Sequence, residues 1–220
     1  MKFAMSYSCG KDSTLALHKQ INAGDEAVCL IVMVNTAAGR SFFHGADYAM
    51  LDEYSRALGI PMIKAETNGS DYHLKMEEAL RKARALGAEA ACFGDIDIDG
   101  NREWSEKRCE NIGLKAFFPL WHRNRAEIVE EIISAGYKCI IKSINNTLLP
   151  ESLLGKSIDN ETVEEMRISG IDICGENGEY HTLAVDGPVF RRPLSFSAGE
   201  ILRFDDYSVV DIRLATDERF

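Results

Sequence analysis

The sequence predicts an α/β fold: a doubly wound parallel sheet, followed by a smaller C-terminal α+β lobe. In the first half of the chain, apolar strand-like runs alternate with helical patterns, and glycine or proline separates them. This alternation is typical of a parallel sheet with helices on both faces. In the second half, short strand patterns follow one another and indicate a mixed or antiparallel sheet. We therefore expect two domains, 1–120 and 121–220.

The elements of the first half follow from the position of apolar residues. A first strand over 1–5 leads into a helix near 15–21 that stops at Gly24. The nearly continuous apolar run 27–34 is typical of a buried parallel strand. The remaining elements are a helix over 46–58, a strand over 60–63, an amphipathic helix over 72–86, a short strand over 90–93 and a helical run over 101–108.

The segment 117–121, FFPLW, is predicted to be the hinge between the lobes, because Pro119 prevents a helix from running through it. Beyond it, a stripe of isoleucine and valine over 128–133 predicts a helix that ends at Gly136. The rest of the lobe is predicted as a strand over 137–144, a solvated helix around Glu164, and strands over 183–185, 189–191 and 207–214. The last strand offers an edge at which a second copy of the chain would pair to form a homo-oligomer.

Composition limits the class of protein. The 220 residues are 45% hydrophobic, which is enough for one large core or two small ones. No apolar run approaches the roughly 20 residues of a membrane span, and the first motif begins too early for a cleavable signal, so we expect a cytoplasmic protein. The formal charge of −10 argues against a large nucleic-acid surface. The six cysteines are scattered, which predicts reduced core thiols and no metal-ligating residues.

The most informative segment is SCGKDS, which lies where the first strand turns into the first helix. Small residues there direct backbone N–H groups and the positive end of the helix at one spot, where a phosphate can bind. Lys11 adds a positive charge. The P-loop pattern G-x-x-x-x-G-K-[ST] is absent, since Met5 stands five residues before Gly10 and Asp12 follows the lysine. The predicted phosphate-binding residues are Ser8, Cys9, Gly10, Lys11, Asp12 and Ser13.

Two further strand ends carry polar residues that we expect near a nucleotide, because ligands bind beyond the carboxyl ends of parallel strands. Asn35 follows the second strand, and Gly94 and Asp95 follow the strand over 90–93. Gly94 is expected to let the backbone approach the nucleotide closely, and Asp95 is a candidate for binding a metal or a ribose, although a helix cap or turn explains it equally well. The acidic residues at 95, 97 and 99 resemble a calcium loop only superficially, since no helix clearly precedes them.

Trp104 and Arg108 fall four residues apart and share a helix face, where they are candidates for orienting phosphate or substrate. The alternative is a buried Trp104 with Arg108 paired to an acid.

A second motif, CGENGEYHT over 174–182, gathers acids, glycines, an amide and a histidine for which packing alone gives no reason. Glu176, Glu179 and His181 are candidates for acid–base work or for binding an amine. A β-turn with solvated acids is the alternative. The remaining candidates for substrate binding in this motif are Asn177, Gly178, Tyr180 and Thr182.

Taken in order, SCGKDS, FGDI, FFPLW, LLPESLLGK and GENGEYHT resemble the diphthine–ammonia ligase (diphthamide synthase) family, within the ATP pyrophosphatase-loop (PP-loop) superfamily of adenine nucleotide alpha hydrolase-like proteins. The resemblance spans most of the chain, and GENGEYHT is its specific element. One departure is Cys9, which replaces the glycine usual in the first motif. The resemblance implies a HUP-like nucleotide-binding lobe at the N-terminus and a C-terminal domain for the acceptor.

It also implies a reaction. Members of the family adenylate a carboxylate of a modified histidine on elongation factor 2, and ammonia then displaces AMP. By resemblance, the catalytic residues are Lys11, Asp12, Glu176, Glu179 and His181, with ATP and Mg²⁺ as cofactors. Ammonia or ammonium and elongation factor 2 are the expected partners.

Two alternatives stay open. The same chemistry can serve a different carboxylate, because related short proteins also look to be present in bacteria, which lack diphthamide. The chain can also be a regulatory protein that binds ATP or AMP without turnover. Sulfur insertion into tRNA is disfavoured, because neither a basic RNA surface nor paired catalytic cysteines are evident.

Overall fold

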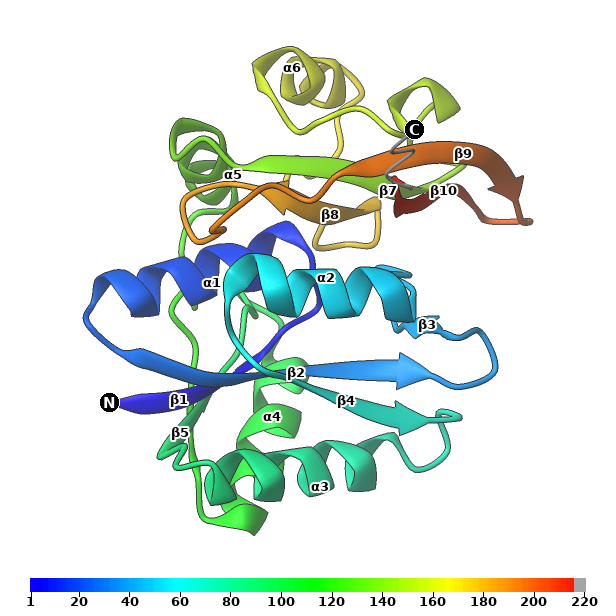
Figure 1. Cartoon of the computed structure of the whole chain (residues 1–220). Helices are drawn as coiled ribbons and strands as arrows, with labels where there is room; N and C mark the ends of the chain where they lie inside the picture. Colours follow the sequence, from blue (N-terminus) through cyan, green and yellow to red (C-terminus); the bar gives the residue numbers. More distant parts are fainter. Residues whose placement is uncertain (216–220) are drawn as a thin grey trace.

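The computed structural model describes residues 1–215. Two β-sheets lie one above the other with a layer of helices between them and further helices on their outer sides (Figure 1). The lower sheet belongs to the first half of the chain and the upper sheet to the second half. None of the helices in the described residues combines the length and the apolar character needed to cross a membrane.

The first sheet is parallel except for one short strand. Its parallel strands lie in the order β4-β2-β1-β5-β6, and β3 pairs antiparallel with the end of β2. The bounds are β1 (Lys2–Ser6), β2 (Glu26–Asn35), β3 (Arg40–Ser41), β4 (Met62–Thr67), β5 (Ala90–Cys92) and β6 (Lys115–Phe117). The carboxyl ends of β1 and β5 are neighbours, which brings together the loops that follow them.

Helices cover both faces of this sheet, so the predicted doubly wound architecture is confirmed. Because side chains alternate along a strand, Phe3 and Met5 of β1 belong to one core cluster and Ala4 to another. The first cluster also holds α1 (Lys11–Asn22) and α2 (Tyr48–Leu58), and the second holds α3 (Tyr72–Ala85) and α4 (Asp99–Ile112).

The second sheet is antiparallel, with its strands in the order β8-β7-β10-β9. Its strands are β7 (Lys138–Asn145), β8 (Tyr180–Asp186), β9 (Phe196–Arg203) and β10 (Tyr207–Leu214). The same half of the chain contains the helices α5 (Arg125–Ser134) and α6 (Asn160–Ile168) and the 3-10 turn Glu151–Leu153. Leu15 of α1 and Ile141 of β7 belong to the same buried cluster, so one core joins the two sheets through α1 and α2. The division into domains at residue 120 stays a prediction.

Two expectations for the C-terminal lobe are wrong. The segment 189–191 is a turn in which the Phe190 amide bonds to the Gly187 carbonyl, while Arg191 bonds to Ala57 at the end of α2. β10 has the predicted bounds but lies between β7 and β9, so it is no sheet edge for a partner. The strands at the two edges are β8 and β9. The sequence did not reveal β9, because most of its residues are exposed and no apolar alternation marks it.

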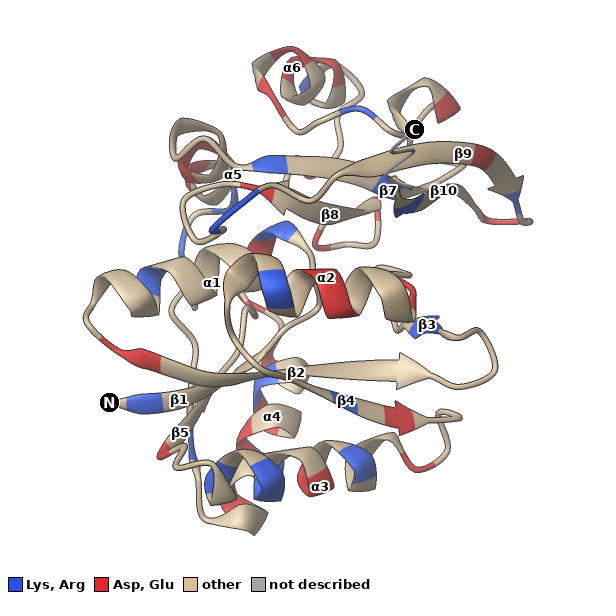
Figure 2. Ribbon diagram, viewed as in Figure 1, with Lys and Arg blue, Asp and Glu red and all other residues tan. Residues whose placement is uncertain are grey.

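Most other elements were predicted with shifted ends. α2 begins at Tyr48 because the Asp47 side chain accepts a hydrogen bond from the Met50 amide and caps the helix. α4 is longer than predicted at both ends, and β6 occupies part of the expected hinge. Figure 2 shows acidic and basic residues mixed along α2 and α3 rather than one sign gathered on either helix.

Candidate functional site

The SCGKDS segment forms the turn between β1 and α1, where its own side chains fix its shape. The Ser8 hydroxyl accepts a hydrogen bond from the Gly10 amide at 3.3 Å and lies 3.0 Å from the Ser13 hydroxyl. The Ser13 hydroxyl donates to the Gly10 carbonyl at 3.1 Å. The turn therefore holds the start of α1, with its positive helix end, facing out of the sheet.

Neighbouring segments leave the loop no freedom to shift. A Cβ on Gly10 would lie 2.3 Å from Cε1 of His44, so only glycine fits under that imidazole. A Cβ on Gly94 would lie 2.8 Å from the backbone nitrogen of Ser13. Gly94 therefore permits close approach of the phosphate-loop backbone, while the predicted close approach to a nucleotide stays a prediction.

Cys9 attaches the loop to the protein interior. Its φ is +71°, a conformation that residues other than glycine seldom adopt, and its carbonyl accepts a hydrogen bond from the Ala184 amide of β8 at 2.8 Å. The side chain is fully buried, and burial raises the pKa of its thiol. All six cysteines are buried and free, as the sequence predicted.

Lys11 and Asp12 form an ion pair within the loop. Lys11 Nζ lies 2.7 Å from an Asp12 carboxylate oxygen and 5.6 Å from the centre of the Tyr180 ring. Burial acts to lower the pKa of Lys11, but Asp12 and the other acidic groups around it outweigh burial and hold that pKa well above its usual value. The Lys11 amide also donates to the Thr182 hydroxyl at 3.1 Å, which ties the loop to β8.

The GENGEYHT motif is a loop that runs into β8, and it is folded by its own polar groups. Asp172 accepts hydrogen bonds from the amides of Cys174 and Glu176 at 2.9 and 3.3 Å. The buried Glu179 carboxylate accepts from the amide and the side chain of Asn177 at 2.9 and 3.2 Å. Glu179 thus closes a turn within the loop.

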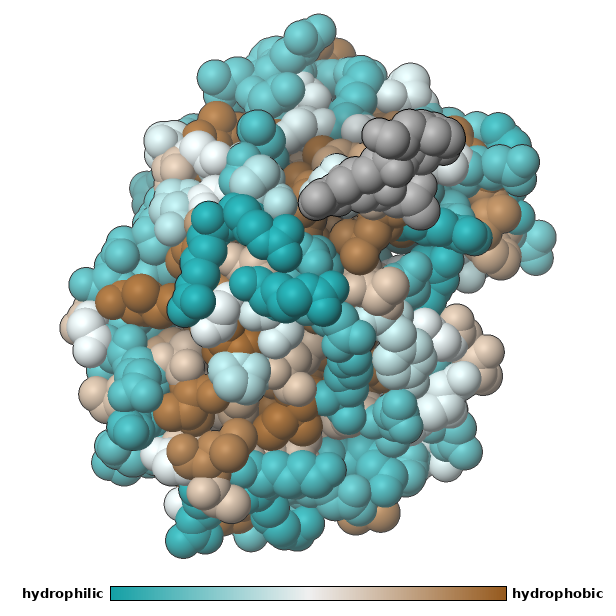
Figure 3. All heavy atoms as spheres, viewed as in Figure 1, coloured by the Kyte–Doolittle hydropathy of each residue, from teal (hydrophilic) through white to brown (hydrophobic). Residues whose placement is uncertain are grey.

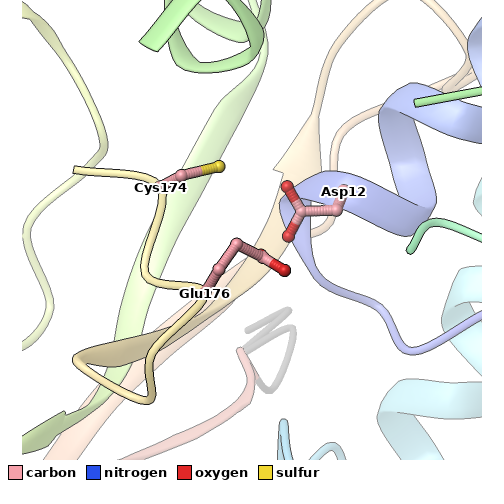
Figure 4. Close-up of side chains that lie close together, drawn as sticks. All are labelled: Asp12, Cys174 and Glu176. Carbon is pink, nitrogen blue, oxygen red and sulfur yellow. The ribbon is translucent and has the colours of Figure 1, made fainter. Parts of the chain in front are cut away.

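Glu176 points the other way, towards the phosphate loop. Figure 4 shows the Glu176 and Asp12 carboxylates turned towards each other, with the sulfur of Cys174 beside them. One ligand atom from each of the three residues lies within 4.8 Å of the others. Burial and the nearby Asp12 carboxylate raise the pKa of Glu176 to about 7. Burial also raises the pKa of Cys174, so its sulfur is a thiol and not a thiolate.

A three-residue contact joins the two lobes beside this cluster. Arg125, at the start of α5, donates two hydrogen bonds of 2.7 Å to Asp97 and one of 2.5 Å to Asp172. Asp97 follows β5 and Asp172 anchors the Glu176 loop, so one guanidinium fixes that loop against the first sheet. The acidic run at 95–99 is therefore no calcium loop: Asp97 binds Arg125 and Asp99 begins α4.

Two imidazoles, those of His44 and His181, also line the space beside the phosphate loop. His44 Nδ1 lies 2.6 Å from the Thr182 carbonyl oxygen and must donate its proton there, because a carbonyl oxygen only accepts. The ring of His181 lies 5.1 Å from that of His44. Burial lowers the pKa of both histidines, that of His44 to about 3 with help from His181, so both are neutral near pH 7.

These groups surround one cavity of about 680 Å³. One end is polar and holds the phosphate loop with the Glu176 loop opposite. The other end is mostly apolar, and the rings of Tyr72 and Trp104 lie 5.8 Å apart there. The lining residues that the sequence predicted are Ser8, Lys11, Asp12, Ser13, Gly94, Asp95, Trp104, Glu176, Gly178, Tyr180, His181 and Thr182.

The other predicted residues lie off this cavity. Cys9 and Gly10 support the loop from behind, while Asn177 and Glu179 turn into their own loop. Asn35 bonds to the amides of Ala37 and Ala38 and lines a neighbouring cavity.

Trp104 and Arg108 do share a face of α4, but Arg108 lies over the far side of the Trp104 ring, 3.3 Å from Glu77. The alternative of an arginine paired with an acid describes its position. Burial raises the pKa of Asp95, which lines the cavity.

The residues of this site that were not foreseen include His44, Tyr72, Arg125 and Asp172. No motif surrounds them. His44 follows the short β3, and Arg125 and Asp172 act through contacts between distant segments, which spacing along the chain does not reveal. The single usable signal was the position of Arg125 directly after the predicted hinge.

The comparisons with known proteins cover nearly the whole chain. The diphthamide synthase N-terminal domain family matches residues 1–116, and the diphthamide synthase C-terminal domain family matches residues 124–217. Similar proteins include the diphthine–ammonia ligase of Danio rerio, 27% identical over 90% of this chain and 88% of that protein. The diphthine–ammonia ligase of Homo sapiens is 25% identical over 92% of this chain and 85% of that protein.

Among solved structures, one described as a predicted subunit of tRNA methyltransferase from Methanocaldococcus jannaschii aligns with a TM-score of 0.45 and 14% identity, covering 88% of this chain and 100% of that chain.

Proposed function

The chain belongs to the diphthamide synthase family, and on this premise we propose that it adenylates the carboxylate of diphthine on elongation factor 2 and transfers ammonia to it, releasing AMP and pyrophosphate. In the terms of its family it is an ATP-dependent ligase that forms a C–N bond. The finer assignment of acceptor and residues is our proposal.

One observation carries the proposal: two polar loops from different lobes face the same cavity, with Asp12 on one and Glu176 on the other. A protein that only senses ATP needs the phosphate loop alone. A second set of acid and imidazole groups opposite the phosphates gives the cavity a place where an acceptor and ammonia can react. The arrangement therefore supports catalysis over sensing.

The first step is attack of the acceptor carboxylate on the α-phosphorus of ATP. A new P–O bond forms, the bond between the α-phosphorus and the bridging oxygen breaks, and pyrophosphate leaves with the electron pair. Lys11 and the positive end of α1 stabilise the charge that develops on the leaving phosphates. The apolar end with Tyr72 and Trp104 suits the flat adenine ring.

In the second step, ammonia attacks the carbonyl carbon of the adenylate. The C–N bond forms, the C–O bond to AMP breaks, and the nitrogen gives up a proton. Ammonia must first be made from ammonium, which calls for a base. A carboxylate with the raised pKa of Glu176 matches this task near neutral pH, because it takes up and releases protons there. The neutral His181 is placed to accept a hydrogen bond from the incoming nitrogen.

The Asp12 carboxylate also fits Mg²⁺, which prefers oxygen ligands and is usually shared with phosphates, whereas Glu176 must be free of the ion to act as the base. When bound there, the ion would neutralise charge on the phosphates of ATP. Cys174 does not fit as a ligand, since a protonated thiol is a poor partner for a hard cation. Asp12 would hold the ion next to the phosphate loop.

The test is release of AMP and pyrophosphate from ATP in the presence of Mg²⁺ and ammonium, with diphthine-bearing elongation factor 2, with the unmodified factor, and with neither. AMP release that requires the diphthine-bearing factor is the expected result. If AMP is released under none of the three conditions while ATP binds tightly, the result would favour a regulatory protein. Ammonium-dependent turnover with a different carboxylate compound would replace the acceptor.

The acceptor-side roles are tested separately with Glu179→Gln and His181→Ala. We expect His181→Ala to lower kcat while the chain stays folded, and Glu179→Gln to act mainly through stability, because its carboxylate is bonded within the loop. Amide formation that is unaffected by His181→Ala would remove His181 from the mechanism, while Glu176 of the same loop is tested by its own variant. The cytoplasmic location and a homo-oligomeric state stay predictions.

A further inference from the structure

A second cavity, of about 610 Å³, adjoins the first between the two lobes. Its lining includes residues of β3, β7 and β10 and of the turn between β9 and β10. Figure 3 shows the surface hollowed at the right-hand edge, between the end of β9 above and the β3 region below. Phe43, His44, Gly178, Tyr180 and His181 line both cavities. A ligand in this second cavity therefore adjoins the nucleotide cavity.

Lys142 of β7 lines the second cavity. It is one of two buried lysines in residues 1–215, with 2% of its surface exposed. The other, Lys11, has Asp12 as its ion-pair partner. Lys142 has no carboxylate within ion-pair distance among the described residues, and its ammonium donates one hydrogen bond, to the Val210 carbonyl. An ammonium has three donors, so two remain for a ligand.

Arg40 and Asp211 at this cavity are already matched, whereas Asp206, in the turn between β9 and β10, has no ion-pair partner among the described residues. Arg40 donates to the Asp211 carboxylate at 2.8 Å and to the Gly45 carbonyl at 3.0 Å, and Arg213 lies 2.6 Å from the same Asp211. Burial and the neighbouring Arg40 outweigh Asp211 and Asp47 and lower the pKa of Lys142 to about 8. The lowered pKa means that burial disfavours the charged form of Lys142, and an anion bound beside it would stabilise that charge.

Apolar side chains form the mouth of the cavity. The rings of Phe204 and Tyr207 are stacked 4.5 Å apart, Leu202 lies beside them in β9, and Phe43 opposite is 70% exposed. Phe43 also has a φ of +64°, so the short β3 turn holds this large side chain in an uncommon backbone conformation. An exposed aromatic mouth above a buried cation matches a ligand with a flat or apolar body and a carboxylate end.

We propose that the second cavity receives the carboxylate-bearing side chain of the acceptor, with Lys142 binding the carboxylate and the rings of Phe43, Phe204 and Tyr207 contacting the body that carries it. The inference rests on the proposed function, since it assigns a place to the acceptor of that reaction. A carboxylate on Lys142 then lies beside the nucleotide cavity, which it must enter past His44 and His181 to attack the α-phosphorus.

The experiment uses two small probes of equal shape, 3-phenylpropionate and its neutral amide 3-phenylpropionamide. Their affinities are measured by NMR titration of the full chain without ATP, so the result does not depend on turnover. The unaltered chain is expected to bind the carboxylate about tenfold more tightly than the amide, the effect of one charge-assisted hydrogen bond. Lys142→Met is expected to bind both probes equally.

Two further variants locate the effect. Lys138→Met changes an exposed lysine of the same strand, which lies 3.4 Å from Asp186, and is expected to keep the preference for the carboxylate. Phe204→Ala is expected to lower the affinity for both probes by a similar factor. ATP affinity serves as the check that Lys142→Met is folded. Equal binding of the two probes to the unaltered chain, no binding of either, or a preference that survives in Lys142→Met would overturn the assignment.

If AMP release fails with every acceptor while the probes behave as expected, the reaction is wrong and the carboxylate site stands. If AMP release succeeds while the probes show no preference, the reaction stands and Lys142 is not the residue that binds the acceptor.

Discussion

Asp12, on the first turn of α1, and Glu176, in the loop before β8, bring their carboxylate oxygens within 4.8 Å of each other. Two carboxylates this close disfavour a double negative charge, and the burial of Glu176 adds to the effect. The fold therefore holds a contact that is unfavourable when both groups are ionised, at the centre of the cavity where a cation and phosphates would meet.

Glu176→Gln should stabilise the protein in a manner that depends on pH. The pKa of Glu176 rises from 4.5 to about 7 on folding, so the folded state binds the extra proton between these values. Its contribution to stability is complete below pH 4.5 and is lost as pH rises through 7. Glutamine has no such loss, so we expect the variant to gain roughly 2–3 kcal/mol at pH 8 and almost nothing at pH 4.5.

Urea unfolding at the two pH values, in EDTA and without ATP, measures this difference. Glu164→Gln, on the exposed side of α6, is the control and should change neither value. The same Glu176→Gln variant should lose amide formation at pH 7. A gain in stability that is independent of pH would mean that Glu176 is not the titrating group.

Lys11→Met should abolish most turnover while the chain stays folded. The ammonium is the charge of the phosphate loop that stabilises the leaving pyrophosphate, and loss of one such group lowers kcat by about 100- to 1,000-fold. Methionine keeps the length and the burial of the side chain. AMP release measures the effect, and Lys107→Met, an exposed lysine of α4 paired with Glu110, should be active. Equal losses in both variants would contradict the role.

The parts of the site that a single segment builds could be predicted from the sequence. The phosphate loop needs small residues, a lysine and a following helix at fixed spacing, and these are visible as a string of letters. The doubly wound sheet was visible for a similar reason, because β2 contains a long apolar run and helical patterns alternate with the strands on either side of it.

The parts of the site that depend on contacts between distant segments could not be predicted from the sequence. The ion pairs of Arg125 with Asp97 and Asp172 link three separate stretches, and each residue alone reads as an ordinary surface charge. Lys142 follows the apolar residues 139–141 of β7, and only the fold shows that it is buried without an acidic ion-pair partner among the described residues. Glu179 shows the reverse: its motif suggested catalysis, while its carboxylate bonds to Asn177.

Gly94→Ala should weaken nucleotide binding more than it weakens the fold. The new Cβ would lie 2.8 Å from the Ser13 backbone nitrogen, which must move and take the phosphate loop with it. We expect the ATP dissociation constant to rise at least tenfold. Gly100→Ala is the matched control, because no atom lies within 4 Å of its Cβ and alanine favours the helix α4 by about 1 kcal/mol. ATP affinity and urea unfolding of both variants decide the matter.

Cys9→Ala should leave catalysis in place. The thiol is buried and its pKa is raised, so it is no nucleophile near neutral pH, and it lies behind the loop rather than in the cavity. The cost is structural, since removal of a buried sulfur leaves a small void, and a destabilisation of about 1 kcal/mol is expected. A kcat below one tenth of the original in a folded variant would show that the thiol does chemistry.

Arg125→Lys tests whether the contact between lobes positions the Glu176 loop. Lysine keeps the charge but cannot make the forked bonds to Asp97 and Asp172. Because the Asp172 carboxylate also holds the amides of Cys174 and Glu176, that loop should loosen, and KM for the acceptor should rise several-fold while ATP affinity changes little. Arg167→Lys, whose guanidinium lies 3.4 Å from Glu130 at the surface, is the control. A rise in KM for ATP alone would assign Arg125 to the nucleotide side instead, because then the loop it anchors would be holding phosphate and not the acceptor.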